Sequence, residues 1–252
     1  MRWLTAIPVY NEAKSVSAVL SEARRHATDL LVVDDGSTDD TPRLLNQEQN
    51  LAKIVHPKNL GYGAALRSAF SYAIAHQYDY LVTMDCDGQH QPDRIGCLLE
   101  HAADFEIVSG SRYLREFRQD VPAPNDRRYI NATITAELNS QFGLSITDSF
   151  CGFKAYRVSA LSSLRLTEDG WGMPLELWVQ AAKLQWRIQE IGVPRVYLDP
   201  SRAFGGVLND PTSRLAHYRS VITRANATFT APPASSSNSS TSPNTIDFCE
   251  AI

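Results

Sequence analysis

Apolar runs alternate with amphipathic or small-residue stretches along the first 110 residues. Short apolar runs, typical of buried strands, span residues 4–9, 30–33, 54–55, 80–84 and 105–109. Between them, the spacing of apolar and small residues predicts helices over residues 12–26, 39–49 and 61–75, and a further helix that begins at Pro92. Because strand and helix alternate, we expect an α/β fold with a mainly parallel sheet and helices on both faces.

The pattern is less regular after residue 110. A polar stretch with prolines predicts a loop over residues 115–126, and a glycine-containing stretch predicts another over residues 201–211. Between and after them we expect helices over residues 129–142, 174–184 and 214–224 and strands over residues 151–156 and 188–198. From residue 226 the composition shifts to Ser, Thr, Asn and Pro, which predicts one domain over residues 1–225 and a disordered tail over residues 226–252.

Composition and charge narrow the class of protein. The apolar fraction of 43% is that of a globular chain, which excludes disorder of the whole protein. Lys and Arg number 24 against 28 Asp and Glu, and this acidic balance disfavours a nucleic-acid partner. The sequence has no apolar run of the roughly 18–20 residues that a membrane-spanning helix needs, and Pro8 interrupts the N-terminal apolar run where a signal peptide would continue. We therefore expect a cytoplasmic protein without a transmembrane segment.

Polar clusters follow three of the predicted strands. Tyr10-Asn11-Glu12 follows the first strand, Asp34-Asp35 the second, and Asp85-Cys86-Asp87 the fourth. The carboxyl ends of parallel strands meet at one edge of a sheet, where ligands bind in such folds. The sequence therefore predicts one site at this edge.

Asp85 and Asp87 are the candidate metal ligands. Two carboxylates one residue apart repel each other when ionised, and a divalent cation removes that penalty; oxygen ligands suit Mg²⁺ or Mn²⁺. Gln89 offers a further amide oxygen. The alternative is a solvated turn, in which Asp and Gly are common.

The other two clusters also allow two interpretations. One carboxylate of Asp34-Asp35 is placed to accept a hydrogen bond from a nucleotide base or ribose, or the segment is a strand-to-helix turn. In the first cluster, Tyr10 and Glu12 suit stacking on a base and binding a ribose hydroxyl, whereas Asn11 suits a helix cap. The glycine-rich segment 59–63 is compatible with phosphate binding or with close helix packing.

Six strings taken together resemble a known family. In order, they are P-V-Y-N-E, D-D-G-S-T-D-D-T, N-L-G-Y-G-A-A-L, M-D-C-D-G-Q-H-Q-P, G-S-R-Y and D-S-F-C-G-F-K-A-Y. Each string is weak alone, but six in order are specific. Over residues 7–215 the chain resembles family 2 glycosyltransferases of the GT-A, Rossmann-like fold, and within them the dolichyl- or polyprenyl-phosphate mannosyltransferases.

The resemblance implies roles for individual residues. The residues that match the nucleoside-binding positions are Pro8, Tyr10, Glu12, Asp34 and Asp35. Asp85 and Asp87 match the metal-binding pair, and Gln89 matches a glutamine that joins the metal. Basic residues near the phosphates are matched by Arg112, Arg128 and Arg202, with Arg127 as an alternative to Arg128.

The implied reaction is metal-dependent, inverting transfer of a hexose from a nucleotide-diphosphate sugar to a polyprenyl phosphate. The resemblance favours GDP-mannose as donor, with UDP-glucose as a second choice, and assigns catalytic roles to Asp87, Arg112 and Arg202. A phosphate acceptor is already anionic, whereas a hydroxyl acceptor needs a base. Glu176 is the candidate base, and its alternative is a carboxylate on a helix surface.

Two other functions stay open at this stage. The first is a family 2 enzyme that uses a UDP-sugar and a sugar hydroxyl, and the second is a nucleotide-sugar-binding protein without turnover. The chain also departs from the family pattern, because Ser213-Arg214-Leu215 stands where a Ser-Lys-Leu string is common, residues 204–211 lengthen the preceding segment, and no transmembrane hairpin follows.

A lipid acceptor requires contact with a membrane, and the last predicted helix is the candidate. Basic residues flank its apolar side: Arg214, His217, Arg219 and Arg224. This pattern is compatible with a membrane surface and a peripheral position on its inner face. The alternative is a helix packed on the catalytic domain.

Overall fold

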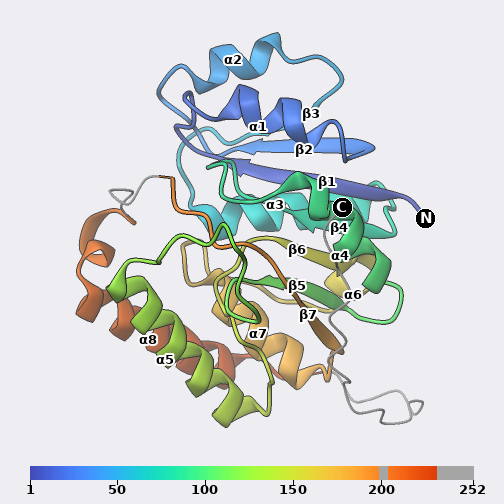
Figure 1. The fold of residues 1–252 in the computed structure, drawn as a ribbon. Helices are drawn as coiled ribbons and strands as arrows, with labels where there is room; N and C mark the ends of the chain where they lie inside the picture. The colour runs from blue at the N-terminus through green and yellow to red at the C-terminus, as the bar shows by residue number, and fades with distance from the viewer. Residues whose placement is uncertain (199–203, 232–252) are drawn as a thin grey trace.

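The computed structural model describes residues 1–198 and 204–231 (Figure 1). Its centre is a seven-stranded sheet of order β3-β2-β1-β4-β6-β5-β7. The strands are β1 (Trp3–Val9), β2 (Asp29–Asp34), β3 (Ala52–Val55), β4 (Tyr80–Thr83), β5 (Ile107–Ser111), β6 (Lys154–Arg157) and β7 (Ile188–Gly192).

Strands β1 to β4 form the parallel part of the sheet that the apolar runs predict. Val9 and Val55 both pair with Asp34, so the ends of β1, β2 and β3 are level at one edge. β4 pairs with the other side of β1 in the same direction. β6 is antiparallel to both β4 and β5 and separates them, and β7 completes the sheet beside β5.

Helices cover both faces of the sheet, as the alternation of elements predicts. They are α1 (Val16–Ala23), α2 (Thr41–Gln47), α3 (Tyr62–Ala75), α4 (Ile95–His101), α5 (Asn125–Phe142), α6 (Val158–Leu161), α7 (Met173–Lys183) and α8 (Pro211–Thr228). One apolar core takes side chains from α1, α2 and α4, and the other from α3 and α5 to α8. α5 and α8 lie side by side in this second layer (Figure 1).

Several predicted bounds are wrong, each for a local reason. α1 begins at Val16 rather than at residue 12, and Asn11 does not cap it, because its side chain accepts the Thr38 N–H at 2.8 Å. The strand predicted to reach residue 198 ends at Gly192, since Pro194 cannot donate to the ladder. α5 begins at Asn125, and α8 continues past the predicted domain end at residue 225. Most of the predicted tail lies outside the described residues.

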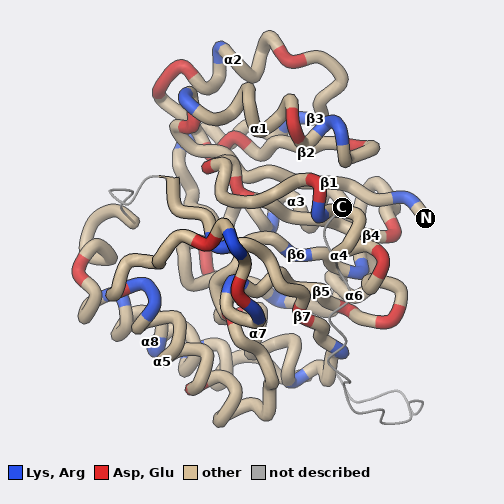
Figure 2. Tube along the Cα trace, in the orientation of Figure 1, with Lys and Arg blue, Asp and Glu red and all other residues tan. Residues whose placement is uncertain are grey.

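The last helix, α8, packs against the domain. Its apolar residues Tyr218, Val221 and Ile222 are buried. Its arginines at 214, 219 and 224 pair with acidic side chains of other segments, so they do not form a separate basic face. Within residues 1–198 and 204–231, no helix is long and apolar enough to cross a membrane. Lys, Arg, Asp and Glu are interspersed along the described chain (Figure 2).

Candidate active site

A cavity of about 1060 Å³ opens at the carboxyl ends of β1, β2 and β4. We call its lining residues between 8 and 90 the first wall and those between 112 and 218 the second wall. The structure brings most of the predicted site residues into it: Pro8, Tyr10, Glu12, Asp35, Asp85, Asp87, Gln89 and Arg112. Asp34, Arg128 and Glu176 are not among the described lining residues, and Arg202 lies outside the described residues.

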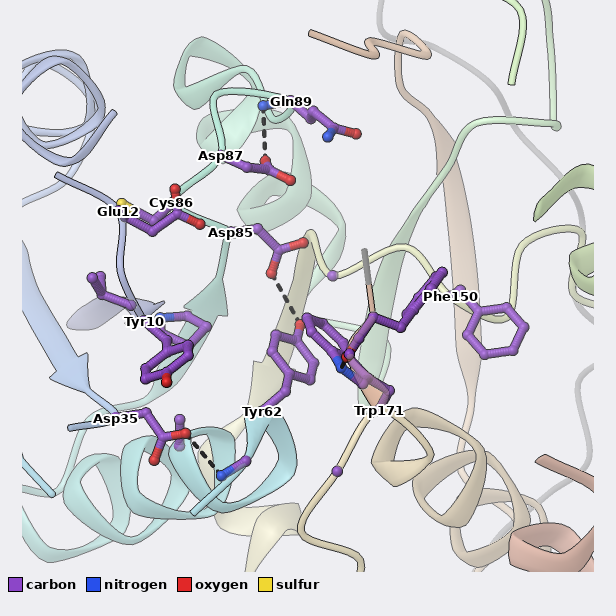
Figure 3. A pocket seen from close by; sticks show the side chains of 18 of the residues that line it. Tyr10, Glu12, Asp35, Tyr62, Asp85, Cys86, Asp87, Gln89, Phe150 and Trp171 are labelled. Atoms are coloured by element: carbon purple, nitrogen blue, oxygen red, sulfur yellow. Dashed lines mark hydrogen bonds between the residues drawn. The ribbon is translucent and has the colours of Figure 1, made fainter. Parts of the chain in front are cut away.

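Asp34 and Asp35, although adjacent, have different surroundings. Asp34 is buried and accepts the Ser37 N–H at 2.9 Å. This hydrogen bond is the one expected if the segment is a strand-to-helix turn. Asp35 lines the cavity and accepts the N–H groups of Leu60 and Gly61 at 2.9 and 2.8 Å. Figure 3 shows one hydrogen bond of Asp35. Asp35 thus fastens the glycine-rich segment before α3 to the end of β2.

Glycine is required at two places in this arrangement. Gly36 and Gly61 both have positive φ angles, +71° and +110°. A Cβ atom on Gly36 would overlap the backbone of Lys58, and one on Gly61 would overlap the backbone of Asp169. Close backbone packing, rather than a phosphate, accounts for these two positions.

Asp85 is held from two sides. The Tyr62 hydroxyl donates to its Oδ1 at 3.0 Å (Figure 3), and its backbone N–H donates to Nδ1 of His90 at 2.9 Å. Burial and the nearby Asp85 charge raise the pKa of Tyr62 well above its usual value, so Tyr62 stays a donor at neutral pH. His90, which the sequence analysis missed, also stacks on Phe153. The Asp85 carboxylate therefore has a fixed orientation.

Asp85, Asp87 and Gln89 lie together at the cavity and are the residues to test for a metal site. The Gln89 N–H donates to Oδ1 of Asp87 at 3.0 Å and closes the turn that carries all three residues (Figure 3). In the described part of the chain, no group of three or more His, Cys, Asp or Glu side chains is arranged to hold a metal. The oxygen ligands suit Mg²⁺ or Mn²⁺, and Mg²⁺ commonly binds through one or two carboxylates together with substrate phosphates. These residues fit such a shared site and not an all-protein cage.

In the second wall, Arg112 is clamped by a residue that has no assigned role in the sequence analysis. Asp148 accepts its Nε and Nη2 at 2.7 and 3.0 Å and its backbone N–H at 3.1 Å. Burial alone would raise the pKa of Asp148, but the charge and hydrogen bonds of Arg112 outweigh it and lower the pKa to about 2. Asn131 donates to the same carboxylate at 2.8 Å.

Glu190 fixes the turn that carries Asp148. Its carboxylate accepts the N–H and the hydroxyl of Thr147, both at 2.7 Å, and the Asp148 N–H at 3.1 Å. Burial raises the pKa of Glu190 to about 7. The orientation of Arg112 thus depends on two carboxylates behind the cavity wall.

Arg127, rather than Arg128, reaches the cavity. The Arg127 guanidinium lines the cavity and lies 5.1 Å from the ring centre of Phe204, whereas Arg128 is exposed. Arg214 lies 4.3 Å from the same ring and pairs with Asp126. Of the two arginines that the resemblance leaves open, Arg127 lines the cavity and Arg128 does not.

Glu176 does not line the cavity and instead holds the backbone of a neighbouring segment. It is buried, and it accepts the backbone N–H groups of Thr167 and Glu168 at 2.8 Å each and the Thr167 hydroxyl at 2.9 Å. A base must reach the proton that it removes, and this carboxylate is turned into the segment before α7. Its placement contradicts both the predicted catalytic base and the alternative of an exposed helix carboxylate.

The sequence profile of glycosyl transferase family 2 matches residues 5–165, more than half of the chain. This chain is a family 2 glycosyltransferase. An undecaprenyl-phosphate mannosyltransferase of Micrococcus luteus is 32% identical to the transferase over 229 residues, 86% of this chain and 94% of the relative.

Two further relatives support the assignment. A polyprenol monophosphomannose synthase of Mycolicibacterium smegmatis is 30% identical over 210 residues, which cover 76% of each chain. A UDP-N-acetylglucosamine–dolichyl-phosphate N-acetylglucosaminyltransferase of Methanococcus voltae is 29% identical and covers 79% of the transferase and 87% of its own chain.

Solved structures confirm the expected GT-A fold. Glucosyl-3-phosphoglycerate synthase from Mycobacterium tuberculosis superposes with a TM-score of 0.68 at 17% identity, over 90% of the transferase and 80% of that chain. Mannosyl-3-phosphoglycerate synthase from Rubrobacter xylanophilus gives 0.64 at 15% identity, over 90% and 73%.

The carboxylates and the arginines of the transferase lie on different walls of the cavity, while Lys14 also lines the first wall. The described carboxylates that line the cavity all belong to the first wall: Glu12, Asp35, Asp39, Asp85 and Asp87. The described arginines that line it all belong to the second wall: Arg112, Arg127 and Arg214. Trp171 joins the walls, since its ring stacks on Tyr62 at 5.0 Å and its Nε1 donates to the Phe204 carbonyl at 3.0 Å.

Proposed function

We propose that the transferase moves a hexose from a nucleotide-diphosphate sugar to a polyprenyl phosphate, with inversion at the sugar carbon and with Mg²⁺ or Mn²⁺ as cofactor. GDP-mannose is the favoured donor. The proposal draws on the Micrococcus luteus and Mycolicibacterium smegmatis relatives, one an undecaprenyl-phosphate mannosyltransferase and the other a polyprenol monophosphomannose synthase. It requires a peripheral position at the membrane face where nucleotide sugars are present, which we propose to be the cytoplasmic face.

The residues of the second wall favour a phosphate as the acceptor. Its described residues include three arginines and neither Asp nor Glu. A hydroxyl acceptor needs a base that takes its proton, whereas a phosphate monoester already carries negative charge at neutral pH. Arginines bind phosphate oxygens with paired, charge-assisted hydrogen bonds. Asp148 already takes Nε and Nη2 of Arg112, which leaves its Nη1 group. A carboxylate-free lining with this group and Arg127 suits a phosphate better than a sugar hydroxyl.

In the proposed reaction a phosphate oxygen of the acceptor attacks the anomeric carbon. The bond from that carbon to the donor diphosphate breaks, and the nucleoside diphosphate leaves with the electron pair. Tyr10 and Glu12 hold the nucleoside, Asp35 accepts from the base, and Asp34 serves only the turn. Arg112, Arg127 and, outside the described residues, Arg202 bind phosphate oxygens.

The cofactor would be held by Asp85, Asp87 and Gln89 together with the donor diphosphate. When bound, it supplies positive charge that stabilises the leaving diphosphate. In support, glucosyl-3-phosphoglycerate synthase, which shares the fold, has been crystallised with UDP and Mg²⁺ or Mn²⁺. The orientation of Asp85 by Tyr62 prepares the site before the donor arrives.

A UDP-sugar is the second candidate donor. The Methanococcus voltae relative is named for a UDP-sugar and a dolichyl-phosphate acceptor, so a change of base and sugar does not require a change of acceptor class. The hydroxyl-acceptor alternative loses its candidate base, because Glu176 does not line the cavity.

The test is release of nucleoside diphosphate from GDP-mannose and from UDP-glucose, each with and without a polyprenyl phosphate and with Mn²⁺, Mg²⁺ or a chelator. We expect release that depends on both the lipid phosphate and the metal, with the glycosyl phospholipid as product. Turnover with a sugar acceptor and none with polyprenyl phosphate would contradict the proposal. Nucleotide binding without turnover on either acceptor would favour a binding protein.

A further inference from the structure

A second hollow, of about 560 Å³, lies against α3 and contains His56. The Nδ1 atom of His56 lies 2.6 Å from Oδ1 of Asp35, which lines the main cavity. Its Nε2 lies 2.9 Å from the hydroxyl of Ser68 on α3. A continuous hydrogen-bonded line therefore runs from Ser68 through His56 to a residue of the first wall.

The sheet brings the two side chains together. Asp35 directly follows β2 and His56 directly follows β3, and the two strands pair in register up to Asp34 and Val55. The His56 backbone N–H donates to the Asp34 carbonyl at 2.8 Å and extends that pairing. The side chains of His56 and Asp35 are 9% and 4% exposed, so water competes little for their contact.

This Ser-His-Asp line does not form a hydrolytic site. Ser68 lies in the middle of α3, where the surrounding backbone N–H groups bond within the helix and provide no oxyanion hole. The Asp35 carboxylate also accepts two backbone N–H groups, from Leu60 and Gly61. These hydrogen bonds therefore hold Asp35 and its loop and do not prepare a nucleophile for an ester or a peptide.

The hydrogen bonds on Asp35 leave one acceptor position. An ionised carboxylate offers about four lone-pair positions, two on each oxygen. His56 and Leu60 take both positions on Oδ1, and Gly61 takes one on Oδ2. Because the carboxylate only accepts, the Nδ1 atom of His56 carries a proton and donates to Asp35, and Nε2 forms a second hydrogen bond with the Ser68 hydroxyl.

We propose that His56, held by Ser68, is a positioning residue for donor recognition: it fastens Oδ1 of Asp35 so that Oδ2 keeps one acceptor position for an N–H group of the nucleotide base. This inference rests on the proposed nucleotide-sugar donor. Such a position suits guanine or uracil, whose pairing edges present a ring N–H, and it disfavours cytosine, whose corresponding ring nitrogen is an acceptor.

Two isosteric substitutions separate the two contacts of His56. His56→Asn keeps a donor near the place of Nδ1 and loses the contact with Ser68, whereas His56→Gln keeps a group near Nε2 and loses the donor to Asp35. Calorimetry would measure binding of GDP, UDP and CDP in the presence of Mn²⁺. We expect the dissociation constant of the preferred nucleotide to rise about tenfold in His56→Gln and to change less than about threefold in His56→Asn.

The control variant is His76→Ala, because His76 lines the same hollow and stacks on Tyr72 instead of contacting Asp35. It should bind nucleotides as the wild type does. In steady-state assays His56→Gln should raise the donor KM more than it lowers kcat, and discrimination against CDP should weaken, which loss of folded protein alone would not produce. Thermal unfolding of each variant reports its folded fraction.

Equal binding by His56→Asn and His56→Gln would overturn the inference, and so would absence of nucleotide binding by the wild type. Selective loss in His56→Gln together with no transfer to polyprenyl phosphate would support the inference and refute the proposed acceptor. The two proposals can therefore fail separately.

Discussion

The two walls of the cavity differ in how their charged groups are held. In the first wall, Asp35 and Asp85 lie within two residues of the ends of parallel strands. Asp35 is fixed by two backbone N–H groups and by His56, which follows the neighbouring strand. In the second wall, Arg112 and Arg214 are fixed by carboxylates on other segments, namely Asp148 and Asp126. The first wall depends on strand order, whereas the second depends on ion pairs between distant parts of the chain.

This difference suggests separate duties for the two walls. Carboxylates and a shared metal suit the donor nucleotide and diphosphate, while arginines suit an anionic acceptor. Variants in the first wall should therefore alter donor use, and variants in the second wall should alter acceptor use or the stability of the wall.

The largest effect is expected in the first wall, from Asp87→Ala. Loss of this carboxylate removes a proposed metal ligand at the leaving diphosphate, so kcat should fall by about a thousandfold. Steady-state assays with saturating Mn²⁺ would measure it. Asp93→Ala, at an exposed position after the same turn, should retain wild-type kcat. Full activity of Asp87→Ala would contradict the proposed role of the first wall in donor use.

Asp148→Ala tests how the second wall is held. The substitution leaves the Arg112 guanidinium largely buried and without its main partner, which should lower the free energy of unfolding by about 3–5 kcal/mol. Urea denaturation would measure the loss. Asp40→Ala, which breaks an exposed pair with Arg43, should have no measurable effect. Equal stability of the two variants would show that the clamp is not needed.

Arg127→Gln addresses the acceptor directly. It should raise the KM for polyprenyl phosphate about tenfold and leave the donor KM unchanged, because one charge-assisted contact to phosphate is lost. Arg128→Gln is the matched control, since the next residue along α5 is exposed and outside the cavity wall. A rise of the donor KM instead would assign Arg127 to the donor diphosphate.

The smallest effect on turnover is expected from Glu176→Gln. A catalytic base contributes roughly a hundredfold to ten-thousandfold, whereas a buried residue that fastens the segment before α7 should change kcat less than about threefold. Denaturation should show a loss of stability, since Gln offers one acceptor oxygen in place of two. A hundredfold fall in kcat with intact stability would restore the hydroxyl-acceptor hypothesis.

The sequence predicted the first wall well because its signals are local. Apolar runs that end in acidic residues mark strand ends, and parallel strands bring those ends together; Asp35, Asp85 and Asp87 follow from this rule. The adjacent Asp34 shows the limit of the rule, because a shift of one residue turns its side chain to the Ser37 N–H and away from the cavity lining.

The second wall could be predicted only in part. Insertion of β6 between β4 and β5 is a long-range pairing with no local signal, and the clamp on Arg112 joins residues 36 positions apart. The resemblance leaves the choice between Arg127 and Arg128 open by one residue, and only the packing of α5 shows which of them lines the cavity. Glu176 lies on a correctly predicted helix, but its burial depends on the segment over residues 167–168 that folds against it.

The close backbone contacts at Gly36 and Gly61 limit how the gene can vary. Any side chain at either position would have to displace the main chain of Lys58 or Asp169, and with it the loop that Asp35 fastens. In a library of all single-codon substitutions that is selected for active enzyme, nearly all surviving variants should keep glycine at both positions. The side chain of the exposed neighbour Lys58 does not line the cavity, and this position should return many amino acids, so the loop combines positions of very low and high mutational tolerance within a few residues.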